Sequence, residues 1–213
     1  MKRNWAKLSG GCLARAVLIG GLPLLATGAR AEAVPTKTFD NPEFHYSVAL
    51  PLGCRHEVGP GTRDAVCSPE LDAAKSLEVP AAASLLLEVD AEPVPQDASK
   101  GAADLAQHYN EASFRDELPE AVCGEADRTR VKIDNVKQVL DAARVVYTAS
   151  VACPEIRFLG LGERDGMAQF LITPGWRYRL LARAPKDEFD QNRAAIDAFF
   201  ASFKTAPAET RNQ

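Results

Sequence analysis

The chain has 213 residues, of which 46% are hydrophobic and 25% are charged, and its formal net charge at pH 7 is −4. Its 29 acidic residues outnumber the 25 basic ones, so nucleic-acid phosphates and anionic lipid headgroups repel it unless a local basic patch compensates. We therefore expect no nucleic-acid partner. No segment has the roughly 20 consecutive apolar residues that a membrane-spanning helix needs.

The first 31 residues have the pattern of an export signal. Three basic residues open the segment, residues 16–27 form a short apolar core, and residues 29–31 place alanines at the two positions that a signal peptidase reads. We predict that residues 1–31 are a signal peptide and that the protein is periplasmic or secreted. Cleavage removes five basic residues and no acidic ones, which leaves 20 basic against 29 acidic residues and a net charge of about −9.

Four of the five cysteines remain after this segment, because Cys12 lies within it. A lipid-modified cysteine follows the apolar core of its signal, whereas Cys12 precedes that core, so we do not interpret the signal as that of a lipoprotein. An even number of cysteines in an oxidising compartment favours two disulfides. Cys54, Cys67, Cys123 and Cys153 allow three pairings. We prefer Cys54 with Cys67 and Cys123 with Cys153, because each pair brackets a segment that can fold back on itself. Each closed loop stabilises the fold by about 3 kcal/mol in the loop-closure model.

A metal site is the alternative use of the first two of these cysteines. Cys54, His56 and Cys67 are residue types that bind zinc, and they lie close together in the sequence. The chain has no C-x-x-C pair and only three histidines, which disfavours zinc. We therefore predict no metal and no cofactor.

The first predicted elements after the signal are a strand and a hairpin. Residues 32–43 contain two prolines and several turn formers, and we interpret them as a lead-in segment. Residues 44–51 alternate between apolar and other side chains, which predicts a half-buried strand. Residues 53–67 contain Gly-Pro-Gly between two short extended runs, which predicts a hairpin. The apolar face of the strand holds Phe44, Tyr46, Val48 and Leu50.

The middle of the chain changes from the period of a strand to that of a helix. The run Leu-Leu-Leu-Glu-Val at residues 85–89 predicts a central strand within residues 82–94. Apolar residues three or four apart predict an amphipathic helix over residues 98–118, which ends near Pro119. Residues 144–153 are rich in β-branched and aromatic residues and predict a strand. The preceding residues 136–143 fit either a helical turn or a bend between strands.

The last third of the chain predicts an antiparallel meander followed by a helix. The three runs are residues 156–161, 167–173 and 176–184, with turn signals between them. The helix covers residues 187–203, with Asp187 as its N-cap. We place one domain over residues 44–204 and a flexible tail over residues 205–213. An apolar stripe on the helix predicts core packing on a sheet, and it consists of Phe189, Ile196, Phe199, Phe200 and Phe203.

The two ends of the domain together resemble the PsbP/DcrB-like group of small proteins. The similarity rests on Phe39, on residues 44–51 (FHYSVALP) and on residues 194–203 (AAIDAFFASF). It implies an α+β fold, an antiparallel β-sheet flanked by helices in an α/β/α sandwich. The four cysteines are not part of the resemblance. The resemblance implies an accessory or assembly factor rather than an enzyme, because members of the group are typically of that kind, although fold alone does not determine function.

Two places stand out as candidate binding residues. Arg177, Arg179 and Arg183 fall on one face of a predicted strand, and we interpret them as the solvated outer face of a sheet, with a binding patch as the alternative. His56 lies in the predicted hairpin beside other polar residues. It is either a solvated loop histidine or part of a small polar binding site.

The sequence contains no recognisable catalytic motif, and we predict no catalytic residues. It has no G-x-S-x-G motif and its histidines are scattered. Carboxylate pairs such as Glu117 with Glu120, or Glu163 with Asp165, could do acid–base chemistry only within a cleft.

These observations favour a non-enzymatic accessory or assembly factor that binds another extracytoplasmic protein. One alternative is a small-ligand carrier with an apolar pocket between the terminal helix and the sheet. The other is a hydrolase with a nonstandard site near His56 or His108.

Overall fold

The computed structural model describes residues 35–52, 55–58, 63–68, 85–95, 101–124, 126–141, 144–157 and 160–205, and within 55–58 and 63–68 it describes the backbone alone. All these residues belong to one compact unit, Glu32–Gln213. The predicted signal peptide and Cys54 lie outside the described residues, as does the predicted tail from residue 206 onward.

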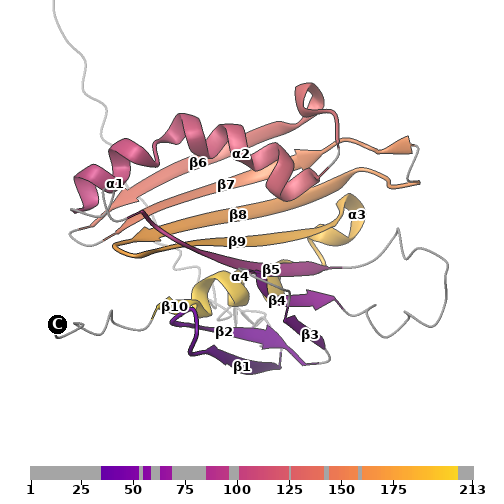
Figure 1. Ribbon diagram of the computed structural model, residues 1–213. Coiled ribbons are helices and arrows are strands. Elements are labelled where there is room, and N and C mark those ends of the chain that lie inside the picture. The colour runs from indigo at the N-terminus through magenta and orange to yellow at the C-terminus, as the bar shows by residue number, and fades with distance from the viewer. Residues whose placement is uncertain are drawn as a thin grey trace, which may run out of the picture. The chain divides into compact units, whose positions relative to one another are not determined.

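Runs of strands are separated by runs of helices along the chain, which is the order of an α+β protein (Figure 1). The strands are β1 (Thr36–Asn41), β2 (Tyr46–Pro51), β3 (Arg55–Val58), β4 (Arg63–Ser68), β5 (Leu86–Pro93), β6 (Lys132–Leu140), β7 (Val145–Cys153), β8 (Arg164–Thr173), β9 (Trp176–Pro185) and β10 (Lys204–Thr205). The helices are α1 (Ala102–His108), α2 (Glu111–Cys123), the 3₁₀ turn η3 (Arg128–Arg130), α3 (Lys186–Phe189) and α4 (Arg193–Ser202).

The strands form two antiparallel sheets. The larger has seven strands in the order β3-β4-β5-β9-β8-β7-β6, and the smaller has the order β1-β2-β10. Strands β7, β8 and β9 follow one another as a meander, of which the sequence predicted the last two strands but not the first. Strand β3 pairs with β4, as the sequence predicted. The fold is therefore α+β with antiparallel sheets.

The two faces of the seven-stranded sheet are covered by different elements. Helices α1 and α2 pack on one face, mainly over β7 and β8 (Figure 1). On the other face, side chains of β5 and β9 share one apolar core with α4 and with β2 of the smaller sheet. This arrangement gives strand β9 two buried faces.

The apolar core beneath β9 confirms the predicted faces of the first strand and the last helix. Ile196 and Phe199 are inaccessible to solvent, as is Leu50 of β2. The Tyr178 hydroxyl donates a hydrogen bond of 3.0 Å to the backbone oxygen of Phe44, and burial raises the pKa of Tyr178 to about 12. The core thus joins the start of the domain to its end.

The predicted lead-in segment contains a strand that the sequence did not indicate, because residues 36–41 form β1. Strand β1 pairs with β2 along its whole length, from Thr36 opposite Pro51 to Asn41 opposite Tyr46. Its side chains are mostly exposed, so the apolar alternation that identifies a half-buried strand is missing. Thr205, predicted to begin the flexible tail, pairs instead with Tyr46 as part of β10.

The single helix predicted over residues 98–118 consists of two helices, and the second continues past its proline. Asn110 interrupts the pattern as the N-cap of α2, because its side chain accepts a hydrogen bond of 3.1 Å from the Ser113 backbone N–H. Proline usually costs a helix interior about 3 kcal/mol. Burial of Val122 and of Cys123 beyond Pro119 offsets that cost and carries α2 to Cys123.

The predicted C-terminal helix is also broken, into α3 and α4. The break falls at residues 190–192, where the Asn192 side chain donates a hydrogen bond to the backbone oxygen of Glu188 at 3.0 Å. Such local side-chain bonds compete with a continuous helix. Asp187 is not an N-cap but lies in the first turn of α3, whose N-cap is Pro185.

Two further predictions for the middle of the chain need correction. Residues 136–140, interpreted as a helical turn or a bend, belong to strand β6, where a register shift between Asp134 and Lys137 disturbs the alternation. The predicted strand at residues 156–161 is only an isolated bridge between Ile156 and Leu161. None of the helices in the described ranges is long and apolar enough to cross a membrane.

Candidate functional site

A ladder of opposite charges runs along the α2 side of strands β5 and β9. Residues of a strand alternate between its faces, so every second residue of β5 points toward the helix layer. The antiparallel register places Asp90 opposite Arg179 and Glu92 opposite Arg177. Directly opposed pairs of unlike charge stabilise adjacent strands. This face is polar along two neighbouring strands that are apolar on their other side.

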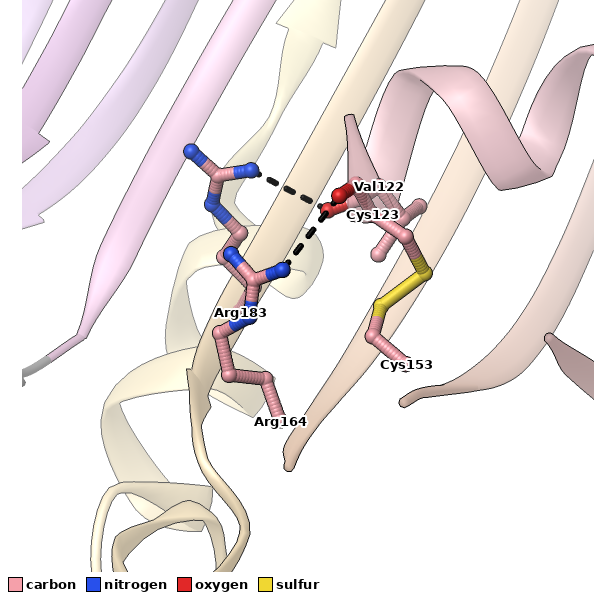
Figure 2. Close-up of a disulfide and its surroundings, with 5 residues drawn as sticks. All are labelled: Val122, Cys123, Cys153, Arg164 and Arg183. Atoms are coloured by element: carbon pink, nitrogen blue, oxygen red, sulfur yellow. Dashed lines mark hydrogen bonds between the residues drawn. A yellow bond between two sulfur atoms is a disulfide. The ribbon is translucent and has the colours of Figure 1, made fainter. Parts of the chain in front are cut away.

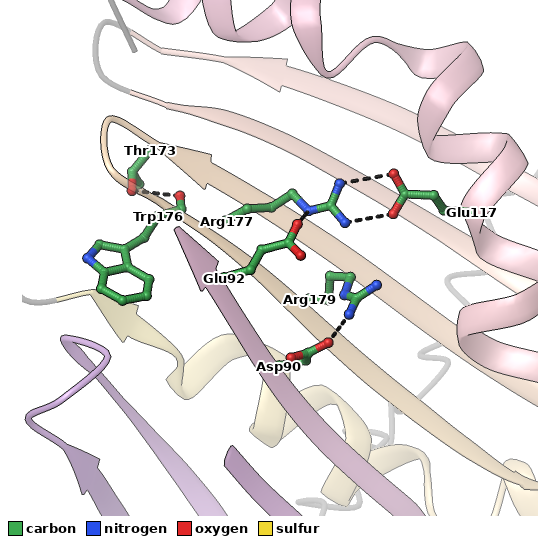
Figure 3. A network of polar contacts seen from close by, with 7 residues as sticks. All are labelled: Asp90, Glu92, Glu117, Thr173, Trp176, Arg177 and Arg179. Carbon is green, nitrogen blue, oxygen red and sulfur yellow. Dashed lines mark hydrogen bonds and ion pairs between the residues drawn. The ribbon is translucent and has the colours of Figure 1, made fainter. Parts of the chain in front are cut away.

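Arg177 is the centre of this charged face (Figure 3). Its two terminal nitrogens donate hydrogen bonds of 2.9 and 2.7 Å to the two carboxylate oxygens of Glu117 on α2. Its Nε forms an ion pair with Glu92 on β5. The guanidinium carbon lies 5.3 Å from the centre of the Tyr109 ring and 5.5 Å from that of Phe170. One arginine therefore ties the helix layer to two strands.

The turn that precedes β9 helps to fix the position of Arg177. The Thr173 hydroxyl donates a hydrogen bond of 3.0 Å to the backbone oxygen of Trp176, which closes the turn between β8 and β9 (Figure 3). Gly175 adopts a φ of 101°, a left-handed conformation that favours glycine. The sharp turn sets the register of β9, which places Arg177 opposite Glu92.

The second charged pair lies one step farther along the ladder. Arg179 forms an ion pair with Oδ2 of Asp90, whose side chain is only 5% exposed. Among the described residues no hydrogen-bond donor reaches the other oxygen of Asp90, Oδ1. A buried carboxylate oxygen without a donor costs free energy, so a cationic or N–H group placed there would be stabilised.

The C-terminal end of α2 is held against the sheet by three contacts (Figure 2). The disulfide Cys123–Cys153 confirms one of the two predicted pairings. Arg183 donates a hydrogen bond of 3.1 Å to the carbonyl oxygen of Val122, and Arg164 donates one of 3.3 Å to that of Cys123. These bonds satisfy carbonyl groups that a helix end leaves without partners.

A glycine on β8 permits this close approach of α2. A Cβ atom on Gly166 would lie 2.5 Å from Cγ1 of Val122 and 3.0 Å from the backbone oxygen of Ala182. Burial lowers the pKa of the neighbouring Arg164, and the charge of Arg183 lowers it further. The C-terminal end of α2 therefore lies close to β8, where Arg164 and Arg183 reach its last carbonyl groups.

A cleft of about 520 Å³ lies between α2 and strands β5 and β9. Its volume is in the range of small-ligand pockets. The helix side of the cleft is an i, i+3, i+4, i+7 stripe that includes two small residues, which leave the space open. The described lining consists of Glu88 and Asp90 from β5, Arg179, Leu181 and Arg183 from β9, and Glu117, Glu120, Ala121 and Gly124 from α2 and its C-cap.

The carboxylates around Arg177 are unequal in their surroundings. Burial raises the pKa of Glu92 above its usual value of 4.5, the charge of Arg177 lowers it, and the nearby Glu117 raises it. At the rim of the cleft, Glu120 forms an exposed ion pair with Arg128. Such exposed pairs contribute little to stability.

The structure brings the three predicted arginines together but corrects their environment. Arg177, Arg179 and Arg183 share one face of β9, as the alternation predicted. The interpretation as a solvated outer face is wrong, because this face lies beneath α2, and the Arg177 side chain is only 8% exposed. Whether these arginines bind a partner stays a prediction.

The other predicted site residues fall partly outside the described structure. The backbone of His56 lies in β3 opposite Cys67, while both side chains lie outside the described residues. The predicted Cys54–Cys67 bond and the alternative zinc site lie outside them as well. Within the described ranges no cluster of His, Cys, Asp and Glu could hold a metal ion.

Sequence reasoning missed the acidic partners on β5. The alternation of Glu88, Asp90 and Glu92 was visible as a charged face on a strand. Their opposite charges lie on β9, 89 residues away in the case of Asp90 and Arg179, so the register was needed to pair them. Of the two predicted carboxylate pairs, Glu117 and Glu120 do line a cleft.

The antiparallel sheet with helices on both faces is a PsbP-like α+β fold. Among solved structures, the chain is similar to the one described as "Solution Structure of Cyanobacterial PsbP (CyanoP) from Synechocystis sp. PCC 6803", with a TM-score of 0.53 and 17% sequence identity. The match covers 86% of this chain and 99% of the other. No protein-family model and no curated protein matches the sequence.

Proposed function

We propose that this protein is a non-enzymatic accessory or assembly factor that works outside the cytoplasm and binds another protein. The observation that carries the proposal is the PsbP-like fold, which extends over 86% of the chain. Members of the group that the sequence resembles are typically accessory or assembly factors. Because shared fold alone does not determine function, the site must support the same conclusion.

The chemistry of the cleft supports binding rather than catalysis. Its charged groups engage one another: Arg179 pairs with Asp90, and Glu117 is held by two hydrogen bonds from Arg177. The described lining contains no histidine, serine or cysteine, and three of its four carboxylates are held by arginines: Asp90 by Arg179, Glu117 by Arg177 and Glu120 by Arg128. Fixed charges around a solvent-filled cleft favour recognition of a partner of complementary charge.

Two features support a site of action outside the cytoplasm. Residues 1–31 have the pattern of an export signal. The Cys123–Cys153 bond joins α2 to β7, and disulfides of this structural kind persist in oxidising compartments such as the periplasm. The periplasm or the extracellular space is therefore the proposed location.

The carrier alternative receives less support. It required an apolar pocket between the terminal helix and the sheet, but Ile196 and Phe199 of α4 fill that interface with inaccessible side chains. The cleft lies instead on the opposite face of the sheet and is lined mostly by charged residues. The hydrolase alternative, near His56 or His108, also receives less support: the His56 side chain lies outside the described residues, and His108 is exposed at the end of α1 beside the ring of Tyr109.

Photo-cross-linking in the native cells, followed by native mass spectrometry, tests the proposal. One variant carries a photoreactive residue at Glu120 on the rim of the cleft, and a control carries it at Asp197, which is exposed on α4. We expect a defined cross-linked protein from position 120, recovered again when that protein is itself tagged, and none from position 197. A bound mass of small-molecule size without a protein partner would contradict the proposal and favour the carrier.

A further inference from the structure

We propose that the partner protein adds an extended strand to the outer edge of β6, along residues 137–140. This inference rests on the proposed function and gives the protein a second contact surface besides the cleft. Strand β6 is the outermost strand of the seven-stranded sheet, and no described strand pairs with its outer edge (Figure 1). Such an edge leaves backbone N–H and C=O groups available to a strand from another chain.

The turn after β6 shows which backbone groups point outward. The Asp141 N–H donates a hydrogen bond of 3.1 Å to the backbone oxygen of Arg144, so these two residues are a hydrogen-bonded pair at the end of the β6–β7 ladder. Hydrogen-bonded and non-hydrogen-bonded pairs alternate along an antiparallel ladder. The pairs that Leu140 and Gln138 form with β7 are therefore of the second kind. Their backbone groups point away from β7, toward the free edge.

The two halves of β6 differ in how well the edge is protected. Lys132 and Asp134 are exposed charges in the first half. The register shifts between Asp134 and Lys137, and Asn135 has a φ of 55°. Charges and bulges of this kind prevent edge-to-edge pairing. The register is regular from Lys137 onward, so residues 137–140 remain able to pair.

The same residues carry exposed apolar side chains. The described ranges contain three large apolar side chains that are more than half exposed, and two of them are adjacent at the end of β6: Val139, 59% exposed, and Leu140, 54% exposed. They point to opposite faces of the sheet, since successive residues of a strand alternate. An added strand with an apolar residue beside each would cover both, and burial of apolar surface stabilises the pairing.

Lys137 adds a requirement of charge. It is exposed, lies on the same face as Val139, and forms no ion pair with any described residue. Opposite charges on directly opposed residues stabilise adjacent strands. An antiparallel strand that meets all three positions therefore has two successive apolar residues, then any residue, then an acidic one. Its apolar residues lie beside Leu140 and Val139, and its carboxylate lies beside Lys137.

A second copy of the chain is a poorer occupant of this edge. In the two-fold register that matches the bonding phase, Val139 lies opposite Val139 of the other copy, and the register shift of each β6 lies beside the turn that follows the other β6. Pairing then stops after a few residues, whereas a stable interface buries about 1,200–2,000 Å². A loop or chain end of a larger partner has no such conflict and adds contacts of its own.

The test is an NMR titration of the purified protein with the blocked peptide Thr-Ile-Val-Thr-Glu-Thr. Its Ile, Val and Glu lie beside Leu140, Val139 and Lys137 in the antiparallel register. In one control peptide, N-methyl groups on the Ile and the second Thr remove the N–H donors that face β6, and in the other Lys replaces Glu. We expect amide exchange of Gln138 and Leu140 to slow at least threefold at 5 mM peptide, and both controls to bind at least fivefold more weakly.

Two matched variants place a lysine at exposed apolar positions. Val139→Lys changes the proposed edge, whereas Leu52→Lys changes the third exposed apolar side chain, which is 63% exposed and follows β2 in the other sheet. We expect at least fivefold weaker peptide binding in V139K and a change below twofold in L52K. Near-UV circular dichroism checks that both variants are folded, and sedimentation velocity measures self-association.

Four results would overturn the inference: unchanged amide exchange of Gln138 and Leu140 at 5 mM peptide, equal binding of either control peptide, undiminished binding by V139K, or a dimer of the native protein that V139K abolishes. The cellular cross-link separates this inference from the proposed function. A partner that is cross-linked from position 120 and still binds V139K with full affinity leaves the accessory function standing and overturns the strand addition. If no partner is cross-linked while the peptide binds, the proposed function fails and the edge is a binding site for extended peptides.

Discussion

Strands β5 and β9 have one apolar face, which is buried, and one charged face, which lies beneath α2 and stays partly exposed. On the first face, Leu87 and Val89 of β5 pack with Leu180 of β9 against the core that contains α4. On the second, Asp90 and Glu92 are paired with arginines beneath α2. The backbone and its register are the same for both faces, so the side chains alone make the difference.

The comparison shows two ways of closing a sheet face. Apolar packing fills space and excludes water, and its free energy grows with the area buried. Paired charges must recover the cost of leaving water through geometry and hydrogen bonds, and they often contribute little net stability. The charged face also keeps an open cleft, whereas Ile196 and Phe199 are inaccessible on the apolar face. Stability should therefore depend mainly on the apolar face and binding on the charged one.

Phe199→Ala should lower the free energy of unfolding more than any other change proposed here. A small loss would contradict the view that stability depends mainly on the apolar face. Phe199 on α4 is inaccessible to solvent, and loss of a buried phenylalanine costs about 4 kcal/mol of unfolding free energy through lost burial and a residual cavity. The adjacent Phe200 is only partly buried, so Phe200→Ala is the matched control and should cost less. Urea denaturation measures both, and equal losses would contradict the assignment of the core.

Removal of the disulfide should have the next largest effect. The bond closes a loop of sequence separation 30, for which the loop-closure model gives about 3.5 kcal/mol. The double variant Cys123→Ala with Cys153→Ala should lose this stability, and reduction of the native protein by dithiothreitol should reproduce the loss. A double variant as stable as the native protein would show that Arg164 and Arg183 suffice to hold the end of α2.

Arg177→Met should cost less, about 2 kcal/mol. Breaking a buried ion pair usually costs about 3–5 kcal/mol because a charge is left uncompensated, but water reaches Glu92 and Glu117, whose side chains are 34% and 32% exposed. Adding Glu117→Gln to the variant should restore part of the loss, because it removes one stranded carboxylate. A double-mutant cycle by urea denaturation measures the coupling. A coupling energy of zero would mean that the ion pair between Arg177 and Glu117 orients the two side chains without stabilising the fold.

Local sequence patterns were enough to predict which side of a strand is buried where apolar and polar residues alternate along it. The alternation in residues 44–51 correctly identified which of these residues face the apolar core. Strand β1 was not predicted, because an edge strand with exposed polar side chains has no apolar alternation. It is a strand because its backbone pairs with that of β2. The alternation also predicted that the three arginines share one face of β9, but it did not predict that α2 packs over that face.

The charged site could not be assembled from the sequence for a related reason. Arg177 and Glu117 are 60 residues apart, and their contact depends on how α2 crosses the sheet. The cleft depends on the same crossing and on two small residues, Ala121 and Gly124, at helical spacing. Local periodicity indicates a face of an element, whereas a site between two elements requires their tertiary arrangement.

The smallest predicted effect is a pH dependence that sharpens the contrast within the charged face. Burial raises the pKa of Glu92 above 4.5, so the folded protein keeps this proton to a higher pH than the unfolded chain does. Unfolding therefore releases a proton between pH 4.5 and the raised pKa, and the stability of the native protein falls as the pH rises through that interval. Glutamine does not titrate. The free energy of unfolding of Glu92→Gln, relative to the native protein, should thus increase from pH 4 to pH 7.

Glu163→Gln is the control of opposite sign. Glu163 is exposed, and a hydrogen bond from Lys186 lowers its pKa below 4.5, so its contribution to stability is present above pH 4.5 and is lost as the pH falls through the lowered pKa. Relative to the native protein, this variant should lose stability as the pH rises toward 4.5 and then remain constant. Urea denaturation at half-unit steps from pH 3 to pH 7 measures both differences. Parallel curves for the two variants would show that Glu92 is as well solvated as Glu163, and that the charged face is open to water along its whole length.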